Sequence, residues 1–227
     1  MRFRQQVETC LNYWPAEGPV QRELILGTVG AYRRPIDSRP VLIQDVRGQE
    51  GTFTLDIHGF QFIKHISQHV ASFDEASVLK DNMTALEAEH LLKTRWAIVN
   101  IWRPLKPVPR DPLAVSDARS FHDKDLLEIY GRVPGRQAKK DYDAATKGSG
   151  FGMLYGKYSP GQQWFYMSDM KPDEALLIKC YDSKDDGRTA RRTPHTAFVD
   201  PRTRDVKVAR ESLELRCLVF FEDQPLA

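Results

Sequence analysis

The segment "QQWFYMSDMKPDEALLIKCYDSKDDGRTARRTPHTAFVDP" runs from residue 162 to residue 201 and contains three short runs typical of β-strands. These runs are residues 162–170, 174–183 and 193–201, and each is rich in the aromatic or branched side chains that strands favour. The turn-forming groups "KPD" (171–173) and "DDG" (185–187) separate them. This part of the chain therefore predicts consecutive short β-strands.

The same pattern continues on both sides of this segment. Further strands are predicted at residues 95–105, 112–120, 151–159 and 212–222. Many short strands at fairly even spacing are typical of a sandwich or a barrel, and a double-stranded β-helix, or jelly roll, fits their number. The polar, Gly- and Lys-rich stretch 131–150 is predicted to be a long loop. The expected fold class is mainly β with some α.

The first half of the chain adds a hairpin and a helix to this prediction. Residues 41–48 read as a strand, and after a turn Phe53, Leu55 and Ile57 alternate with polar neighbours, which predicts an antiparallel hairpin. Residues 74–95 instead show helical spacing of apolar residues, with Asp74 as a plausible N-cap. One or two helices are therefore expected beside the strands.

The predicted domain organisation is an N-terminal arm at residues 1–40 followed by a single body at residues 41–227. The arm is rich in proline, arginine and polar residues, and the large rings of Tyr13 and Trp14 could anchor it to the body. The chain has 227 residues, a length that suits one domain, or one domain with an appended arm.

Composition excludes several classes of function. Hydrophobic residues make up 41% and charged residues 28% of the chain, so a sizeable core is possible. The net charge of +2 does not favour nucleic acid as the main partner. No apolar run approaches the roughly 20 residues that span a bilayer, and the N-terminus has no apolar signal-peptide core. Three scattered cysteines form no CxxC pair, so a reduced, cytoplasmic setting is expected.

Chemically useful side chains gather near the C-terminus. His195 begins one late strand, and Arg210 and Ser212 begin the next. In a jelly roll, matching ends of neighbouring strands open into one mouth, where Arg can bind a carboxylate through two parallel N–H bonds and Ser adds a third donor. The alternatives are a structural histidine held by a local hydrogen bond, and a surface salt bridge from Arg210 to Asp200 or Asp205.

Four long motifs resemble a known family. They are "VLIQDVRGQEGTFTLDIHGFQFIKH" (41–65), "VNIWRPLKPVPRDPLAVSDARSF" (99–121), the segment 162–201 quoted above, and "RESLELRCLVF" (210–220). Together they closely resemble the fungal hydroxylase/desaturase family, which includes a gibberellin desaturase and relatives of the bacterial cephem methoxylation protein. The resemblance implies a jelly-roll oxidoreductase of the iron(II)/2-oxoglutarate type that hydroxylates or desaturates a small molecule in secondary metabolism.

The resemblance also implies roles for individual residues. His195 occupies the position of a metal ligand, and Arg210 and Ser212 that of the anchor for the distal carboxylate of 2-oxoglutarate. No residue is assigned a catalytic role. The residues expected to line the substrate pocket are Trp102, Arg103, Asp117, Arg119 and Tyr166. Plain core packing is the alternative for the aromatic residues, and an ordinary ion pair is the alternative for Asp117 and Arg119.

One family feature is missing from this sequence. Family members carry a His-x-Asp that completes a metal site of two histidines and one carboxylate. None of the histidines here has Asp or Glu two residues later; they are His58, His65, His69, His90, His122 and His195. Residues 76–84 look like a junction at which some tens of residues are absent, including the metal-binding strand. Iron binding is therefore expected to be weak.

Three hypotheses remain open at this point. The first is an oxygenase-type hydroxylase or desaturase. The second is a family member that has lost redox chemistry and works as a binding subunit, in a homodimer or in a heterodimer with a full-length relative. The third is a non-oxidative isomerase or cyclase that uses the same pocket. A small-molecule substrate is common to all three.

Overall fold

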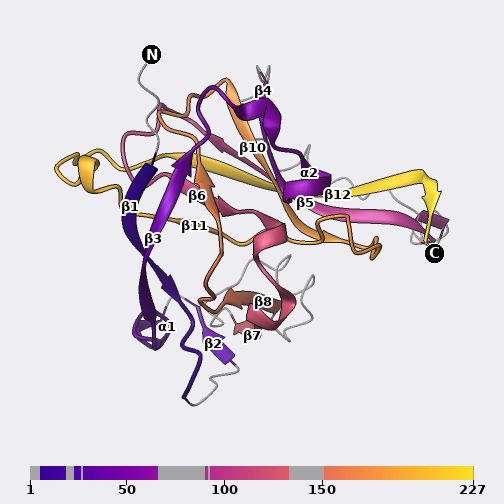
Figure 1. Cartoon of the computed structure of the whole chain (residues 1–227), viewed down its shortest axis with the longest axis horizontal. Helices are drawn as coiled ribbons and strands as arrows, with labels where there is room; N and C mark the ends of the chain where they lie inside the picture. The colour runs from indigo at the N-terminus through magenta and orange to yellow at the C-terminus, as the bar shows by residue number, and fades with distance from the viewer. Residues whose placement is uncertain are drawn as a thin grey trace, which may run out of the picture. The chain divides into compact units, whose positions relative to one another are not determined.

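The computed structural model describes residues 6–18, 23–26, 28–65, 90–91, 93–132 and 151–226 (Figure 1). The strands are β1 (Gln6–Tyr13), β2 (Glu23–Ile25), β3 (Asp37–Asp45), β4 (Phe60–Lys64), β5 (Thr94–Pro104), β6 (Leu113–Ser116), β7 (Leu126–Arg132), β8 (Phe151–Gly156), β9 (Trp164–Tyr166), β10 (Glu174–Asp182), β11 (His195–Ala197) and β12 (Ser212–Pro225). The helical segments are α1 (Val29–Tyr32), α2 (Leu55–His58) and 3-10 turns at Glu50–Thr52, Ala118–Ser120, Asp123–Asp125 and Pro201–Thr203. The predicted fold class, mainly β with some α, is confirmed.

The chain forms two compact units that do not follow chain order. The first contains Met1–Thr9, Leu42–Ser120 and Gln163–Ala227, and the second contains Cys10–Val41 and Phe121–Gln162. Strands β1 and β3 run from one unit into the other. The division into an arm at residues 1–40 and a body at residues 41–227 stays a prediction.

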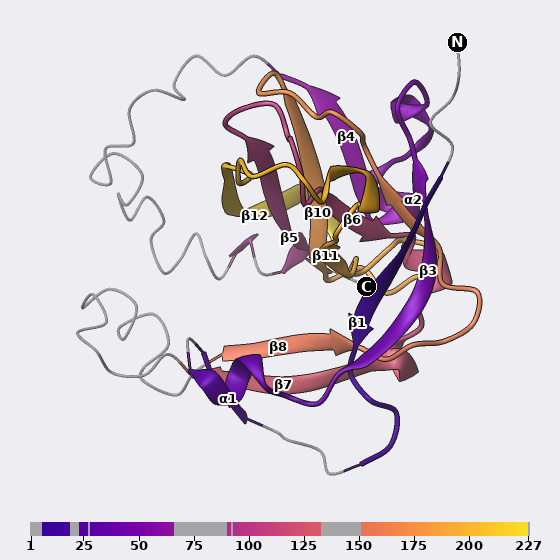
Figure 2. The ribbon, with the colours of Figure 1, turned by 90° about the vertical axis from the view of Figure 1, so that its left-hand side faces the viewer.

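Two sheets build the first unit. One has the order β12-β5-β10-β4 with antiparallel neighbours, and the other has the order β1-β3-β9-β6-β11 (Figures 1 and 2). The main core cluster draws on both, since it contains Trp102 and Leu176 from the first sheet and Val115 and Phe165 from the second. Strands with alternating apolar residues place those residues on one face. The core therefore lies between two facing sheets, as in the predicted jelly roll.

The predicted hairpin of residues 41–62 is wrong. β3 pairs with β9 in one sheet, whereas β4 pairs with β10 in the other. The chain between them forms a 3-10 turn and then α2, which ends at Gly59 in the left-handed region with φ +81°. The alternation of Phe53, Leu55 and Ile57 was misleading, because Phe53 is buried while Ile57 is 48% exposed on the helical turn.

Gly59 is needed where α2 meets the segment before β11. A Cβ at this position would lie 1.8 Å from the Thr193 hydroxyl oxygen, and the backbone there is already left-handed. Thr193 cannot easily retreat, because it is buried and its amide donates to the Lys179 carbonyl at 2.8 Å. Only glycine combines this φ with no side chain.

We expect Gly59→Ala to lower the free energy of unfolding by roughly 1–3 kcal/mol, from backbone strain plus the forced shift of Thr193. Urea unfolding followed by circular dichroism measures it. Gly48→Ala is the matched control, since Gly48 has φ +89° but open space around a built Cβ. Equal losses in the two variants would show that the contact with Thr193 costs nothing.

The second unit holds a small sheet of its own. β2 pairs parallel with β7, and β7 pairs antiparallel with β8. Trp14, Leu24 and Ile129 form its buried cluster. The expected burial of Tyr13 and Trp14 is confirmed, with exposed fractions of 5% and 4%. β7 was not predicted from the sequence.

Two other sequence predictions fall largely outside the described residues. They are the helix at residues 74–95 and the loop at residues 131–150. Within the described ranges, none of the helices is both long and apolar enough to cross a membrane.

Candidate functional site

His195 is held by two neighbouring elements. It begins β11, which pairs antiparallel with β6 so that His195 lies opposite Val115. The Ser116 amide donates to the Pro194 carbonyl at 2.9 Å, which fixes the backbone just before it. Directly opposite residues of an antiparallel pair share a sheet face. Because Val115 belongs to the core between the sheets, the His195 side chain lies on the inner face.

A local contact sets the tautomer of the His195 ring. Its Nδ1 lies 3.1 Å from the Thr193 carbonyl oxygen, and a carbonyl can only accept. Nδ1 therefore donates, and in the neutral ring Nε2 keeps a lone pair. Metal-binding histidines in proteins commonly use this arrangement, in which one ring nitrogen donates to a carbonyl while the other binds the metal. The local hydrogen bond that the sequence left as an alternative is present, and it is compatible with a ligand role.

The described residues do not supply the rest of an iron site. In the part of the chain that the structure covers, no three His, Cys, Asp or Glu side chains come together in a way that could hold a metal. His58 is buried and its Nδ1 accepts from the Thr54 amide at 3.1 Å. His65 accepts from Arg103 at 2.9 Å. His69 lies outside the described residues.

The guanidinium of Arg210 contacts a backbone carbonyl and an aromatic ring. One nitrogen donates to the Asp111 carbonyl at 2.7 Å, and its central carbon lies 5.2 Å from the centre of the Trp102 ring. Burial lowers the pKa of Arg210, and the charge of Asp111 offsets this only in part. The described structure shows no ion pair from Arg210 to Asp200 or Asp205. Asp200 is instead bound by Arg202.

Ser212 lies beside Arg210 at the start of β12. It is opposite Pro104 of β5, and Glu214 is opposite Trp102. Alternate residues of a strand share a face, so Ser212 is on the same face as Trp102, the ring on which Arg210 rests. The structure thus brings Arg210, Ser212 and Trp102 together. His195 also faces inward, from the other sheet, and its sharing of one cavity with Arg210 stays a prediction.

The predicted substrate-pocket residues do not form one group. Arg103 follows Trp102 on β5 and so points to the opposite face, where it donates to the His65 carbonyl at 2.8 Å. This placement does not support a pocket role for Arg103. Asp117 and Arg119 form an ion pair with nitrogen–oxygen distances of 2.6 and 3.0 Å, which was the simpler alternative. Trp102 is packed in the main core cluster.

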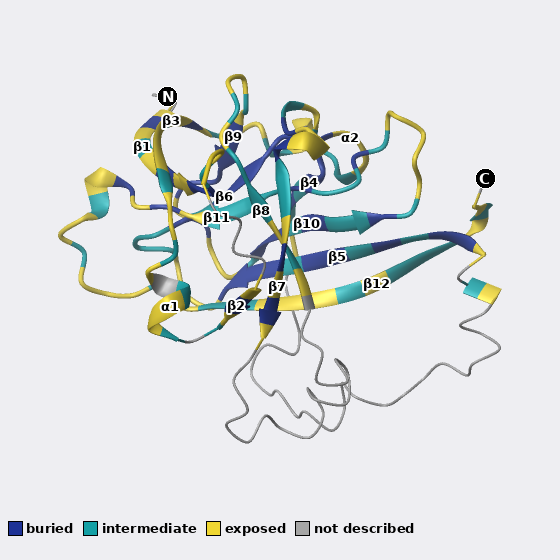
Figure 3. Cartoon of the chain, turned by 90° about the horizontal axis from the view of Figure 1, so that it is seen from below, coloured by how far each residue is buried: buried dark blue, intermediate teal, exposed yellow. Residues whose placement is uncertain are grey.

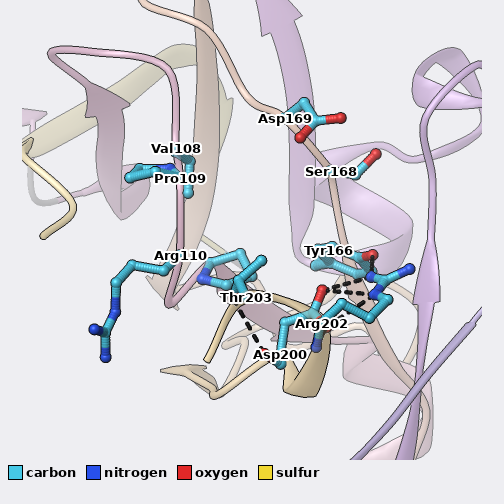
Figure 4. Close-up of a pocket in the computed structure, with 10 residues that line it drawn as sticks. Val108, Pro109, Arg110, Tyr166, Ser168, Asp169, Asp200, Arg202 and Thr203 are labelled. Carbon is cyan, nitrogen blue, oxygen red and sulfur yellow. Dashed lines mark hydrogen bonds and ion pairs between the residues drawn. The ribbon is translucent and has the colours of Figure 1, made fainter. Parts of the chain in front are cut away.

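Tyr166 lines a cavity of about 320 Å³ (Figure 4). Its hydroxyl accepts a hydrogen bond from Arg202 at 2.9 Å. The Arg202 guanidinium also donates hydrogen bonds to the Asp200 carboxylate, with which it forms an ion pair. Burial raises the pKa of Tyr166, and the hydrogen bond from Arg202 offsets this in part. The remaining wall consists of Val108, Pro109, Arg110, Pro112, Ser168, Asp169 and Thr203. Sequence reasoning missed Asp200 and Arg202 as cavity residues, and only their position just after β11 could have indicated them.

Comparison with known proteins places the chain in a family. A family model described as an oxidoreductase/YMDC permease-like domain matches residues 22–85 and 75–220. The hydroxylase/desaturase efuI of Hormonema carpetanum is 34% identical over 292 residues, covering 96% of this chain and 96% of efuI. The hydroxylase/desaturase CTB9 of Cercospora beticola is 34% identical and covers 87% of this chain and 81% of CTB9.

The chain belongs to the fungal hydroxylase/desaturase family. The resemblance seen in the four sequence motifs is therefore confirmed. Among solved structures, the iron and alpha-ketoglutarate-dependent endoperoxidase NvfI matches with a TM-score of 0.70 at 21% identity, covering 96% of this chain and 98% of that chain. This likeness supports the jelly-roll fold.

The alignments also bear on the missing segment. The alignment with efuI spans 292 positions whereas this chain has 227 residues, so at least 65 positions have no counterpart in this chain. The family model matches in two parts that meet at residues 75–85. This break coincides with the predicted junction at residues 76–84, between β4 and β5. This chain therefore lacks internal positions that efuI contains.

Proposed function

We propose that this chain is an oxidoreductase of the iron(II)/2-oxoglutarate type, a hydroxylase or desaturase that acts on a small molecule of secondary metabolism. Family membership over nearly the full length of efuI supports the reaction class. The observation that carries the proposal for the co-substrate is the half-buried guanidinium of Arg210, which rests on Trp102 beside Ser212 and has no carboxylate paired with it among the described residues.

Arg210 and Ser212 would hold the distal carboxylate of 2-oxoglutarate. A planar guanidinium can donate two parallel hydrogen bonds to a carboxylate, and a serine hydroxyl adds a third. One Arg210 nitrogen donates a hydrogen bond to the Asp111 backbone carbonyl, and this contact orients the guanidinium. The other guanidinium nitrogens remain available to a ligand. Partial burial strengthens such contacts because water competes less.

His195 would contribute the lone pair of Nε2 to a metal. A single histidine is not a selective iron site, because selectivity comes from the number, type and geometry of several ligands. The described residues therefore do not fit a complete iron centre. In this chain the Thr193 carbonyl orients the His195 ring so that Nε2 is available to a metal. The described residues contain no cluster of side chains that would supply the other ligands.

A second candidate function has a specific observation in its favour. The two residues proposed to hold a carboxylate, Arg210 and Ser212, are present, while the sequence has no His-x-Asp and the alignment with efuI contains a long gap. That combination suits a family member that binds an acidic ligand without redox chemistry, as a binding subunit or as an isomerase or cyclase. Turnover of 2-oxoglutarate separates this candidate from the first.

We expect purified protein to hold well under one equivalent of iron, because a lone histidine binds iron(II) weakly. Elemental analysis with and without 2-oxoglutarate measures the content. Release of succinate from 2-oxoglutarate, followed as added iron is raised, then tests the function. Turnover that needs a large excess of iron supports the oxidoreductase, whereas calorimetric binding of 2-oxoglutarate with no turnover at any iron concentration supports the second candidate. One equivalent of tightly held iron would contradict the expectation.

A further inference from the structure

Strand β12 leaves one long edge without a partner in the described structure. It is the outermost strand of the sheet β12-β5-β10-β4 (Figure 3). Residues 212–221 and Pro225 pair with β5, with an irregularity between Phe221 and Pro225, and among the described residues no strand pairs with its other edge. An open edge presents a row of free N–H and C=O groups, and proteins normally shorten, charge, bulge or cover such edges. A long edge strand of this kind is a template for pairing with another strand.

Exposed apolar side chains mark the same strand. Leu218 is 59% exposed although it lies in the middle of β12, opposite Ile98 of β5. Phe220, two residues on, shares its face and is partly exposed. Burial of such side chains would be favourable because it removes apolar surface from water.

We propose that β12 pairs antiparallel with β12 of a second copy of this chain, about a two-fold axis at Val219. In this register Leu218 of each copy faces Phe220 of the other, and Arg216 faces Glu222. Each contact occurs twice because the interface is isologous. Apolar and opposite-charge cross-strand pairs both stabilise a sheet. The four-stranded sheets of two copies would then continue into one another.

The alternative occupant, a strand from this chain itself, has less support. The segment that leads into β5, residues 74–95, has helical spacing rather than the alternation of a strand. The two matches of the family model overlap at residues 75–85, in the same region. A single pair of strands buries less surface than a standard interface of about 1,600 Å². The dimer should therefore be reversible and concentration-dependent.

Sedimentation velocity over a range of protein concentrations tests the proposal. We expect wild type to shift from monomer to dimer, and Leu218→Lys to raise the dimer dissociation constant at least about tenfold, because it removes two apolar contacts and buries two charges. Val208→Lys is the matched control, since Val208 is 64% exposed and lies outside the strands. It should dimerise like wild type. Circular dichroism confirms that both variants are folded.

A charge swap tests the register independently of Leu218. Arg216→Glu and Glu222→Arg should each weaken the dimer, since each sets like charges opposite one another. The double variant should recover the wild-type affinity, because the opposite-charge pairs are restored in reversed order. Recovery is expected only if these two residues face each other across the two-fold axis.

Three results would overturn the proposal. Wild type could remain monomeric throughout, with the amides of β12 protected from hydrogen exchange, which would show that the chain covers its own edge. Leu218→Lys could associate as strongly as wild type, which would place the interface elsewhere. The double charge variant could fail to recover, which would exclude the register about Val219.

Discussion

Asp182→Ala should lower the free energy of unfolding by about 3–5 kcal/mol, the usual loss when one partner of a buried ion pair is removed. Asp182 is fully buried at the end of β10. Its carboxylate accepts from Arg95 at 2.7 and 3.1 Å and from Lys179 at 2.7 Å. Both cations are themselves buried, with side chains 4% and 2% exposed. Without Asp182 they would share only Asp56, whose side chain is 60% exposed.

Urea unfolding measures this loss, with Asp185→Ala as the matched control. Asp185 also pairs with an arginine, Arg191 at 2.8 Å, but its side chain is 69% exposed. Exposed ion pairs contribute only about 0–1 kcal/mol, so the control should stay close to wild type. A loss for Asp182→Ala no larger than that of Asp185→Ala would mean that Arg95 and Lys179 find other partners or water.

The same network predicts how stability depends on pH. Burial alone would raise the pKa of Asp182, but hydrogen bonds from Arg95 and Lys179 outweigh it and hold the pKa below its ordinary value. The unfolded chain therefore binds the proton more readily than the folded one. The stability from Asp182 is fully present above its ordinary pKa of about 4 and is lost as the pH falls through the lower folded pKa. Asp182→Ala should accordingly flatten the loss of stability in acid.

Arg210→Lys should weaken the binding of 2-oxoglutarate by at least about tenfold, which corresponds to about 1.4 kcal/mol. Lysine keeps the positive charge but has no planar fork, so one of the two parallel hydrogen bonds to the carboxylate is lost. Hydrogen bonds to charged groups contribute about 1.5–3 kcal/mol each. The lysine would also give up the contact of the guanidinium with the Trp102 ring, which now orients the side chain.

Calorimetric titration of 2-oxoglutarate into wild type and variant decides this prediction. Arg204→Lys is the control, because Arg204 is an exposed arginine of the same connecting segment and should leave the affinity unchanged. Ser212→Ala should weaken binding in the same direction by a smaller amount. Equal affinities of wild type and Arg210→Lys, or no heat with wild type, would leave Arg210 as a structural residue that ties β12 to the loop at Asp111.

The late strands were predictable from local pattern. The expected runs 95–105, 174–183 and 212–222 correspond to β5, β10 and β12 within a few residues. Branched and aromatic residues bounded by turn residues carry this information locally. The predicted hairpin at residues 41–62 was wrong because a short alternation of apolar residues also fits a helical turn. Only the pairing partners of β3 and β4 distinguish a hairpin from a helical turn here.

The sequence by itself determined the family, the positions of His195, Arg210 and Ser212, and the lack of a His-x-Asp, because residue identity and order decide these. The tertiary structure alone decided that the Thr193 carbonyl orients the His195 ring, that Arg210 rests on Trp102, and that Arg103 faces the other way. Tertiary structure alone also joined Tyr166 to Arg202 and Asp200 around a cavity. It likewise left the outer edge of β12 without a strand partner among the described residues. Such contacts join residues far apart in the chain, and their geometry depends on strand order and register, which local patterns do not encode.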